Sequence, residues 1–214
     1  MPELTADQVL TTTRSVRKRL DLSRDVPLSL VRECLEVALQ APSGSNRQAW
    51  HWIVVTDRDR RAALGDLYRR AVRAYLESEG AAGKLFGDDD SRAPVQQRVG
   101  DSVAYLGDHL ADVPVHVIPC LRTGREKLPE GNQAGLWGSL LPAAWSFMLA
   151  ARSRGLGTAW TTLHLAYERE AADILGIPAD VHQGALIPTA FYTGDTFRPA
   201  ARQPLSEVLH IDGW

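Results

Sequence analysis

The longest uncharged run of the chain, residues 131–151, constrains the fold more than any other segment. A transmembrane helix needs about 20 predominantly apolar residues, and this run is interrupted by polar or helix-disfavouring residues such as Asn132, Gln133, Gly138 and Pro142. It is too polar for a membrane span, so we expect a helix over residues 136–152 that protein covers on most sides. Its broad apolar surface belongs either to the deep core or to an interface between subunits.

Helical and strand-like patterns alternate along the rest of the chain. Helices are expected where apolar residues recur at helical spacing, and strands where β-branched and aromatic residues cluster. The expected helices span residues 5–14, 27–40, 57–79, 102–110, 136–152 and 167–175, and the expected strands span residues 50–56, 114–121, 158–163 and 184–193. Pro119 and Pro188 mark an edge, an end or a bulge in their strands. This order predicts a single α+β domain over residues 1–214, with a central sheet covered by helices on both sides.

Composition and charge narrow the class of protein. A net charge of −2 leaves no basic excess for a nucleic-acid partner. Cys34 and Cys120 lie in apolar surroundings without CxxC spacing, so we expect reduced thiols in a cytoplasmic protein. The histidines lack HxxxH and HxH spacing, so no metal site is expected. Residues 1–10 lack the apolar core of a signal peptide.

Two short polar segments are candidates for ligand binding. Arg14 and Arg17 flank Ser15, an arrangement that can grip an anion or can simply form a solvated basic face. Residues 41–50 run from a helix end broken by Pro42, through a turn of small polar residues, into a strand. The hydroxyl and amide groups of such a turn can hold a ligand, and the alternative is an ordinary polar loop.

Two further segments are expected to act outside the core. Residues 80–100 are rich in glycine, and a loop of that length in a compact domain is usually functional or disordered. We expect a mobile flap over a ligand, within a broader insert at about residues 80–128, and the alternative is a solvated excursion. Residues 197–214 are rich in proline and end in Trp214. Because a terminal tryptophan needs apolar cover, this tail is expected to dock on another surface, such as a partner subunit.

Taken together, these segments resemble the nitroreductase family of flavoproteins. The resemblance is carried by residues 14–17 (RSVR), 41–50 (APSGSNRQAW) and 155–162 (GLGTAWTT), with further matches at residues 175–178 (LGIP) and 202–208 (RQPLSEV). It implies an intertwined homodimer of α+β subunits, each with a central, mainly antiparallel sheet, and two FMN sites at the subunit interface. It also implies that NAD(P)H reduces FMN, which then reduces a small-molecule acceptor such as a nitroaromatic or a quinone.

The resemblance also assigns roles to individual residues. Arg14 and Ser15 would hold the FMN phosphate and ribityl chain, and Arg202 would be a second phosphate clamp. Arg17 would lie at the N1 and O2 edge of the flavin, where a cation stabilises the charge of the reduced ring. The other expected cofactor contacts are Val16, Pro42, Ser43, Asn46, Trp160, Thr161 and Thr162. No side chain is expected to be catalytic as an acid or base, because the cofactor carries the hydride chemistry.

The sequence departs from the family pattern in two places. Many members carry an arginine where this chain has Thr13, so phosphate binding would depend more on Arg202. Residues 80–100 contain no Glu-xxx-Tyr pattern like that of the deiodinase branch, so recognition of an amino-acid substrate is not expected. The alternatives are a specialised flavin enzyme acting on a biosynthetic intermediate, a dehalogenase, and a protein that stores FMN without turnover.

Overall fold

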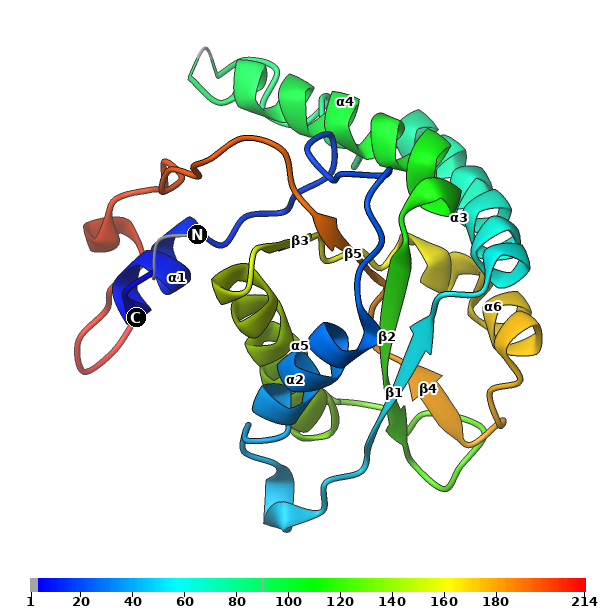
Figure 1. Cartoon of the computed structure of the whole chain (residues 1–214). Helices are drawn as coiled ribbons and strands as arrows, with labels where there is room; N and C mark the ends of the chain where they lie inside the picture. Colours follow the sequence, from blue (N-terminus) through cyan, green and yellow to red (C-terminus); the bar gives the residue numbers. More distant parts are fainter. Residues whose placement is uncertain (1–3, 90) are drawn as a thin grey trace.

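The computed structural model describes residues 4–89 and 91–214, and Figure 1 shows a central sheet with helices on either side. Residues 1–3, part of the segment tested as a signal peptide, and Asp90 in the expected flap lie outside the described residues. Within the described residues, the strands are β1 (Trp50–Val55), β2 (Val115–Arg122), β3 (Leu156–Thr158), β4 (Val181–Gln183) and β5 (Ile187–Phe191). The strand order is β1-β2-β5-β3, β4 pairs with β2, and every ladder is antiparallel. The expected α+β architecture with a mainly antiparallel sheet is confirmed.

Strand β2 lies inside the sheet, so the expectation that Pro119 marks a strand end or an edge was wrong. The Pro119 carbonyl accepts a hydrogen bond of 2.8 Å from the Gly184 amide. In an antiparallel strand the N–H and C=O groups of one residue face the same edge, so the missing amide hydrogen of Pro119 faces the same neighbour. That neighbour is the connection between β4 and β5, which pair with β2 on either side of Pro119. A proline is tolerated there because no ladder bond is lost.

The helices cover both faces of the sheet. They are α1 (Ala6–Thr12), α2 (Leu28–Ala38), α3 (Arg58–Glu77), α4 (Ala93–His109), α5 (Ala134–Ser153) and α6 (Glu168–Leu175), with short 3₁₀ turns η1 (Gly44–Asn46), η2 (Leu110–Asp112), η3 (Leu163–Tyr167) and η4 (Leu205–Glu207). On one face, α2 and α5 bring Cys34 and Phe147 into one buried cluster. On the other face, α3, α4 and α6 bring Leu67, Leu106 and Ala171 into a second cluster (Figure 1).

Helix α5 carries the uncharged run and serves as a core helix. Leu140 and Phe147 are fully buried, whereas Leu141 and Trp145 are 37% and 40% exposed. By its length and a mean hydropathy of 1.3, α5 meets the composition test for a membrane span, but core helices of soluble proteins pass the same test. Pro142 lies inside the helix rather than in its first turn. The helix therefore has both a core face and an exposed apolar strip.

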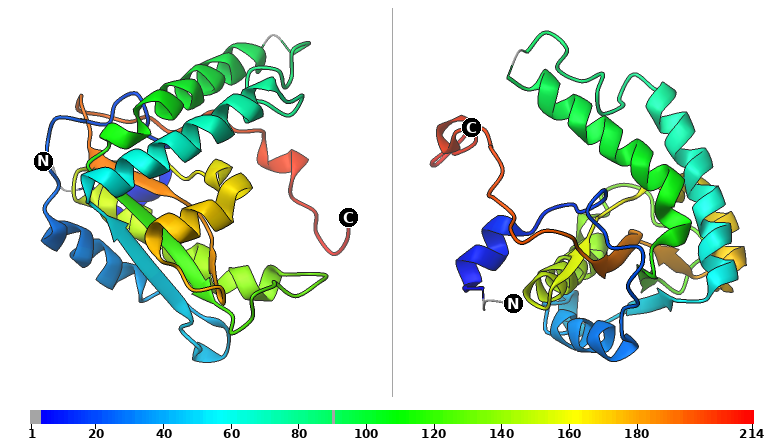
Figure 2. Two further views of the ribbon diagram at one scale, coloured as in Figure 1. Left: turned by 90° about the vertical axis from the view of Figure 1, so that its right-hand side faces the viewer. Right: turned by 45° about the horizontal axis from the view of Figure 1, so that its top comes forward.

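Residues 80–100 are more regular than the sequence indicated. Helix α4 begins at Ala93, and Pro94 lies in its first turn, where a proline costs no helical hydrogen bond. In both views of Figure 2, α3 and α4 lie side by side and the turn that connects them extends beyond the rest of the domain. Gly107 permits this close packing, because a Cβ atom there would lie 2.9 Å from Val72 Cγ1. The irregular part of the expected flap is therefore confined to the tip of a helical hairpin.

Two strand expectations also needed correction. The strand expected over residues 158–163 is β3 (Leu156–Thr158), which ends before Thr161, and Thr161 instead forms an isolated bridge with Leu186. The strand expected over residues 184–193 is shortened to β5 (Ile187–Phe191), because residues 184–186 lie outside the ladder, and β4 (Val181–Gln183) precedes them without having been expected. Neither strand boundary can be predicted from composition, because each depends on where the neighbouring strand pairs with it.

The C-terminal tail leaves the body of the domain after β5 (Figure 1). Its apolar side chains have little cover within the chain: Leu205 is 69% exposed, Ile211 is 77% exposed and Trp214 is fully exposed. His210 stacks on Trp214 with ring centroids 4.3 Å apart. The docking of residues 197–214 on a partner subunit remains a prediction.

Candidate functional site

The segment that contains Arg14 and Arg17 runs alongside β3. Ser15 forms a parallel bridge with Thr158, and the Val16 amide donates a hydrogen bond of 2.8 Å to the Thr158 carbonyl. Val16 is buried against Gly157, where a Cβ atom would lie 3.0 Å from Val16 Cγ1. This pairing places the predicted residues 14–17 next to the start of the predicted segment 160–162, although they are far apart in sequence.

Arg17 is the most unusual charged residue of this region. Its Nη1 donates a hydrogen bond of 3.2 Å to Ser102 Oγ on α4, and its buried Nε has no partner among the described residues. Within the described residues Arg17 forms no ion pair. Burial lowers the pKa of the guanidinium, and the nearby Tyr68 and Tyr75 partly oppose that shift. Arg17 is therefore a half-buried cation for which the described residues supply no counter-charge.

Thr161 is fixed from two directions. Its Oγ1 shares a hydrogen bond of 3.0 Å with Tyr68 Oη on α3, and both side chains are buried. Its backbone amide donates to the Leu186 carbonyl over 3.1 Å, and its carbonyl accepts from the Leu186 amide over 2.8 Å. The amides of Trp160 and Thr162 donate to no acceptor in the described part of the chain. An external acceptor can therefore use the amides on either side of Thr161 but not the amide of Thr161 itself.

The other predicted loop lies at the far end of the sheet. Figure 1 places η1 at the opposite end of the domain from the segment after α1, and the left view of Figure 2 agrees. Pro42 and Asn46 are exposed, and Ser43 Oγ accepts a hydrogen bond of 3.2 Å from the Gln48 amide. The Gly44 amide donates to Ser139 Oγ of α5 over 2.9 Å, and Ser139 had no signal in the sequence. Within one chain, the structure does not bring this loop to Arg17.

The backbone of this loop is unusually constrained. Ser45, Asn46 and Gln48 all have positive φ angles, of 54°, 52° and 50°. Residues other than glycine rarely adopt this conformation, and clusters of such residues are typical of ligand-binding turns. The Gln48 side chain donates to Asn46 Oδ1 over 2.9 Å and supports the turn.

The remaining two predicted site arginines, Arg14 and Arg202, are not in contact with each other in the described part of the chain. Arg14 is half-buried, and Arg202 is exposed in the C-terminal tail. The one hydrogen bond of the Arg202 guanidinium goes to the neighbouring Ala201 carbonyl over 3.1 Å. No described contact links Arg202 to Arg14, so a shared phosphate site is not formed by protein contacts alone.

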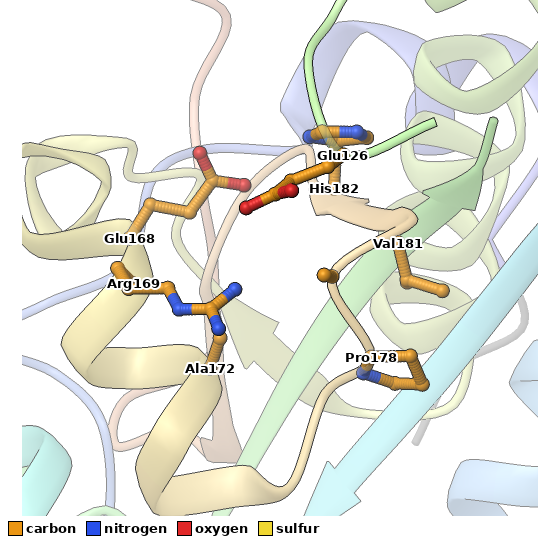
Figure 3. A pocket seen from close by; sticks show the side chains of 8 residues that line it. Glu126, Glu168, Arg169, Ala172, Pro178, Val181 and His182 are labelled. Atoms are coloured by element: carbon orange, nitrogen blue, oxygen red, sulfur yellow. The ribbon is translucent and has the colours of Figure 1, made fainter. Parts of the chain in front are cut away.

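Two cavities of the described part of the chain are lined by none of the predicted site residues. One, of about 100 Å³, is lined by Glu126, Glu168, Arg169 and His182 (Figure 3). Glu168 accepts a hydrogen bond of 2.9 Å from the Gln183 amide, and a His182 ring nitrogen contacts the Arg125 carbonyl at 2.9 Å. These two groups therefore form hydrogen bonds that stabilise the fold. Residues 4–89 and 91–214 contain no cluster of three His, Cys, Asp or Glu side chains that could hold a metal. A second cavity, of about 300 Å³, lies between β1 and the end of α6.

Sequence comparison identifies the family. The sequence model of the Nitroreductase family matches residues 10–189. The chain is 30% identical over 197 residues to the 4-nitrobenzoate reductase of Nocardioides sp. (strain LMS-CY), covering 80% of this chain and 74% of that protein. It is also 30% identical over 213 residues to the NADH dehydrogenase of Thermus thermophilus, covering 98% and 97% of the two chains.

Structural comparison supports the same fold. The FMN- and NADPH-dependent nitroreductase NfnB from sphigopyxis sp. strain HMH superposes with a TM-score of 0.73 at 21% identity, covering 99% of this chain and 100% of that one. Iodotyrosine deiodinase bound to FMN and 3-iodo-L-tyrosine superposes with a TM-score of 0.66 at 18% identity, covering 90% and 92%. The predicted nitroreductase-like fold is confirmed, and the same fold serves more than one chemistry.

Proposed function

We propose that this chain, which belongs to the nitroreductase family, is an FMN-dependent oxidoreductase that passes hydride from NAD(P)H to an electron-poor acceptor. The observation that carries the proposal is Arg17, a partly desolvated guanidinium with an unpartnered Nε, which lies near Tyr68, the hydrogen-bond partner of Thr161. Leaving a buried charge without a partner is costly unless a ligand supplies one. A flavin ring supplies acceptors for this group, and its reduced form adds negative charge there.

The neighbouring groups fit the rest of the cofactor. Bound FMN supplies the hydride chemistry, since it accepts and donates two electrons. Arg14 and Ser15 would bind the phosphate end, and paired arginines suit a phosphate because of its charge and geometry. The acceptor-free amides of Trp160 and Thr162 would donate to the edge of the ring that takes hydride. Arg202 would also bind the phosphate once the C-terminal tail docks on the body of the dimer.

The site requires a second copy of the chain. Because the turn around η1 lies at the far end of the sheet, we propose that its residues Pro42, Ser43 and Asn46 face the FMN bound to the partner subunit. Exposed apolar side chains on α2, at its C-terminal cap and on α5 support a dimer interface: Leu28, Val37, Leu39, Leu141 and Trp145 are each between 37% and 43% exposed. Burial of such a strip provides the driving force for stable association.

The acceptor is proposed to be an electron-poor aromatic compound such as a nitroaromatic or a quinone. Its support is the 30% identity to a protein named 4-nitrobenzoate reductase over 80% of this chain. The likeness to iodotyrosine deiodinase rests on 18% identity and carries no substrate argument. Storage of FMN without turnover would require the hairpin of α3 and α4 to cover the flavin permanently.

The direct test is spectroscopic. Purified protein is expected to be yellow, to hold about one FMN per chain, and to lose its visible flavin absorbance when NADH or NADPH is added without oxygen. A colourless protein that takes up no added FMN would overturn the proposal. A yellow protein that neither nicotinamide bleaches would favour storage or another electron donor.

The shared site has its own test. An Arg17→Met chain and an Asn46→Ala chain would each form a homodimer with two damaged sites. Random mixing of the two chains should restore about a quarter of the sites, because half of the dimers are mixed and each has one native site. Flavin reduction that recovers on mixing supports a site built from two chains, and no recovery argues that all contacts come from one chain.

A further inference from the structure

Arg152, in the last turn of α5, is a buried cation that the proposed chemistry does not use. It is 6% exposed, its Nε has no partner, and within the described residues it forms no ion pair. Its Nη1 donates a hydrogen bond of 2.6 Å to Tyr192 Oη, and its Nη2 lies 3.4 Å from Thr12 Oγ1. The guanidinium also lies 4.9 Å from the ring centroid of Phe197. Burying a charge this deeply costs free energy of folding, so a role beyond packing is expected for the Arg152 guanidinium.

Arg19 holds the same region from the other side. Its Nε donates to the Thr193 carbonyl over 2.7 Å and its Nη1 donates to the Thr196 carbonyl over 2.9 Å. Its guanidinium lies 4.2 Å from the ring centroid of Phe197. Gly194, with φ of 79°, makes room for it, because a Cβ atom there would lie 2.8 Å from Arg19 Nη2. The ring of Phe197 is therefore contacted by two arginines.

These contacts tie together two segments that are remote in sequence. Thr12 lies two residues before Arg14, and Phe197 begins the tail that carries Arg202. Arg152 contacts both segments at once, and Arg19 fixes the root of the tail. Beyond this root the tail has little cover, so its direction is set where it leaves the body.

We infer that Arg152 and Arg19 are positioning residues for a phosphate monoester, because they fix the residues that precede Arg14 against the root of the tail that carries Arg202. The inference rests on the proposed binding of FMN. An arginine on an untethered tail loses conformational entropy when it binds, and fixing the root of the tail removes part of that cost beforehand. Two further cations behind the site also raise the local positive potential, which favours a dianion over a neutral group.

Comparison of FMN with riboflavin isolates this effect, because the two ligands share the ring and ribityl chain and differ in the phosphate. Dissociation constants of both would be measured by quenching of flavin fluorescence with the apo protein of the wild type and of Arg152→Met, Arg19→Gln and Arg154→Gln. Arg154 is the matched control, since it caps the same helix but pairs with Glu33 at 3.4 Å, and its side-chain hydrogen bonds among the described residues go to Glu33, Ala150 and Ser153. Arg152→Met keeps much of the side-chain volume while removing the charge and the hydrogen bonds.

Arg152→Met and Arg19→Gln are each expected to weaken FMN binding roughly tenfold, the scale of one charge-assisted hydrogen bond. Riboflavin binding should change by less than about twofold, and Arg154→Gln should change neither constant. Arg152→Lys should remain impaired, because an ammonium group keeps the charge but cannot reproduce the planar fork. If Arg152→Met does not fold, as judged by circular dichroism, Arg19→Gln decides the matter.

The opposing results are distinct. An equal loss of FMN and riboflavin affinity would show a general structural role and overturn the inference. Full rescue by Arg152→Lys would show that charge alone matters, and would also overturn positioning. A ratio of the two constants that stays at the wild-type value in both variants would overturn this inference while leaving the proposed function standing. A wild type that binds neither flavin would overturn both.

Discussion

Replacement of Arg17 by methionine should change the midpoint potential of bound FMN while leaving the stability of the apo protein almost unchanged. The guanidinium has one protein hydrogen bond, to Ser102, and no ion pair within the described residues, so its removal loses little protein contact. One neutral hydrogen-bonding partner contributes about 1 kcal/mol, and the removal of a desolvated charge returns a cost of its own. The free energy of unfolding of the apo protein should therefore not fall by more than about 1 kcal/mol, as measured by urea titration.

The effect on bound flavin should be larger. Two unit charges ~4 Å apart at an effective dielectric constant of ~20 attract by roughly 4 kcal/mol, and solvent around a half-buried side chain reduces this to about 2 kcal/mol. Because about 1.4 kcal/mol corresponds to 30 mV for a two-electron couple, Arg17→Met should lower the midpoint potential of bound FMN by about 40 mV. Anaerobic titration against a reference dye measures this shift.

A matched control is available on α4. Arg98 is exposed, so Arg98→Met removes an arginine without removing a desolvated one. Its midpoint potential should equal that of the wild type. An unchanged potential in Arg17→Met, or an equal change in both variants, would refute the placement of Arg17 at the flavin edge.

Three further outcomes are expected. Gly107→Ala should lower stability by about 1–3 kcal/mol in thermal unfolding, because the new Cβ atom would meet Val72 Cγ1 at 2.9 Å. Burial lowers the pKa of His116 and of His164 to about 4, so the unfolded chain binds the extra protons first as the pH falls. The contribution of these histidines to the free energy of unfolding should then be constant above the unfolded pKa of about 6.5 and fall by up to about 1.4 kcal/mol per pH unit for each histidine between there and about pH 4, as urea titrations at several pH values would show. Deletion of residues 198–214, which removes exposed apolar side chains of the tail, should weaken dimer formation in sedimentation experiments, and an unchanged dimer would argue against docking of the tail.

The helices that the sequence predicted best carry their signals locally. Thr5 and Gln8 form the reciprocal capping box that begins α1, and Asp57 accepts from the Arg60 amide at the start of α3. Gly176 ends α6 with φ of 68°. Each of these signals spans only a few residues, so it can be recognised without knowing the tertiary structure.

The missed boundaries depend on partners that are distant in sequence. The start of α4 was hidden because glycine and Pro94 indicated a loop, whereas packing against α3 stabilises the helix from Ala93 onward. Pro119 indicated an edge, yet it lies inside the sheet because the neighbouring chain leaves the ladder beside it. Local sequence propensity does not indicate whether a neighbouring strand continues to pair at that position or turns away from the sheet.

The site shows the same division. Residues 14–17 and 155–162 were grouped by their resemblance to a family, and the pairing of Val16 with Thr158 agrees with that grouping. Tyr68 and Ser102 were missed, because a single tyrosine or serine on an amphipathic helix has no distinguishing pattern. Their roles arise only when α3 and α4 are packed over the segment of Arg17.

The separation of the two candidate groups within one chain is itself informative. In the proposed site, Arg17 with the 160–162 segment would form one half, and the strained turn at Ser45 and Asn46, at the far end of the sheet, would form the other half. A turn with positive φ angles at three residues other than glycine is costly to maintain, and neither of the two cavities described above is lined by either group. The strained turn and the lack of an adjoining cavity are both explained if a second copy of the chain presents its turn to the Arg17 of the first copy, because the two halves then form one complete site. Catalytic competence would in that case appear only with the dimer, and the activity per chain should fall on dilution in step with dissociation.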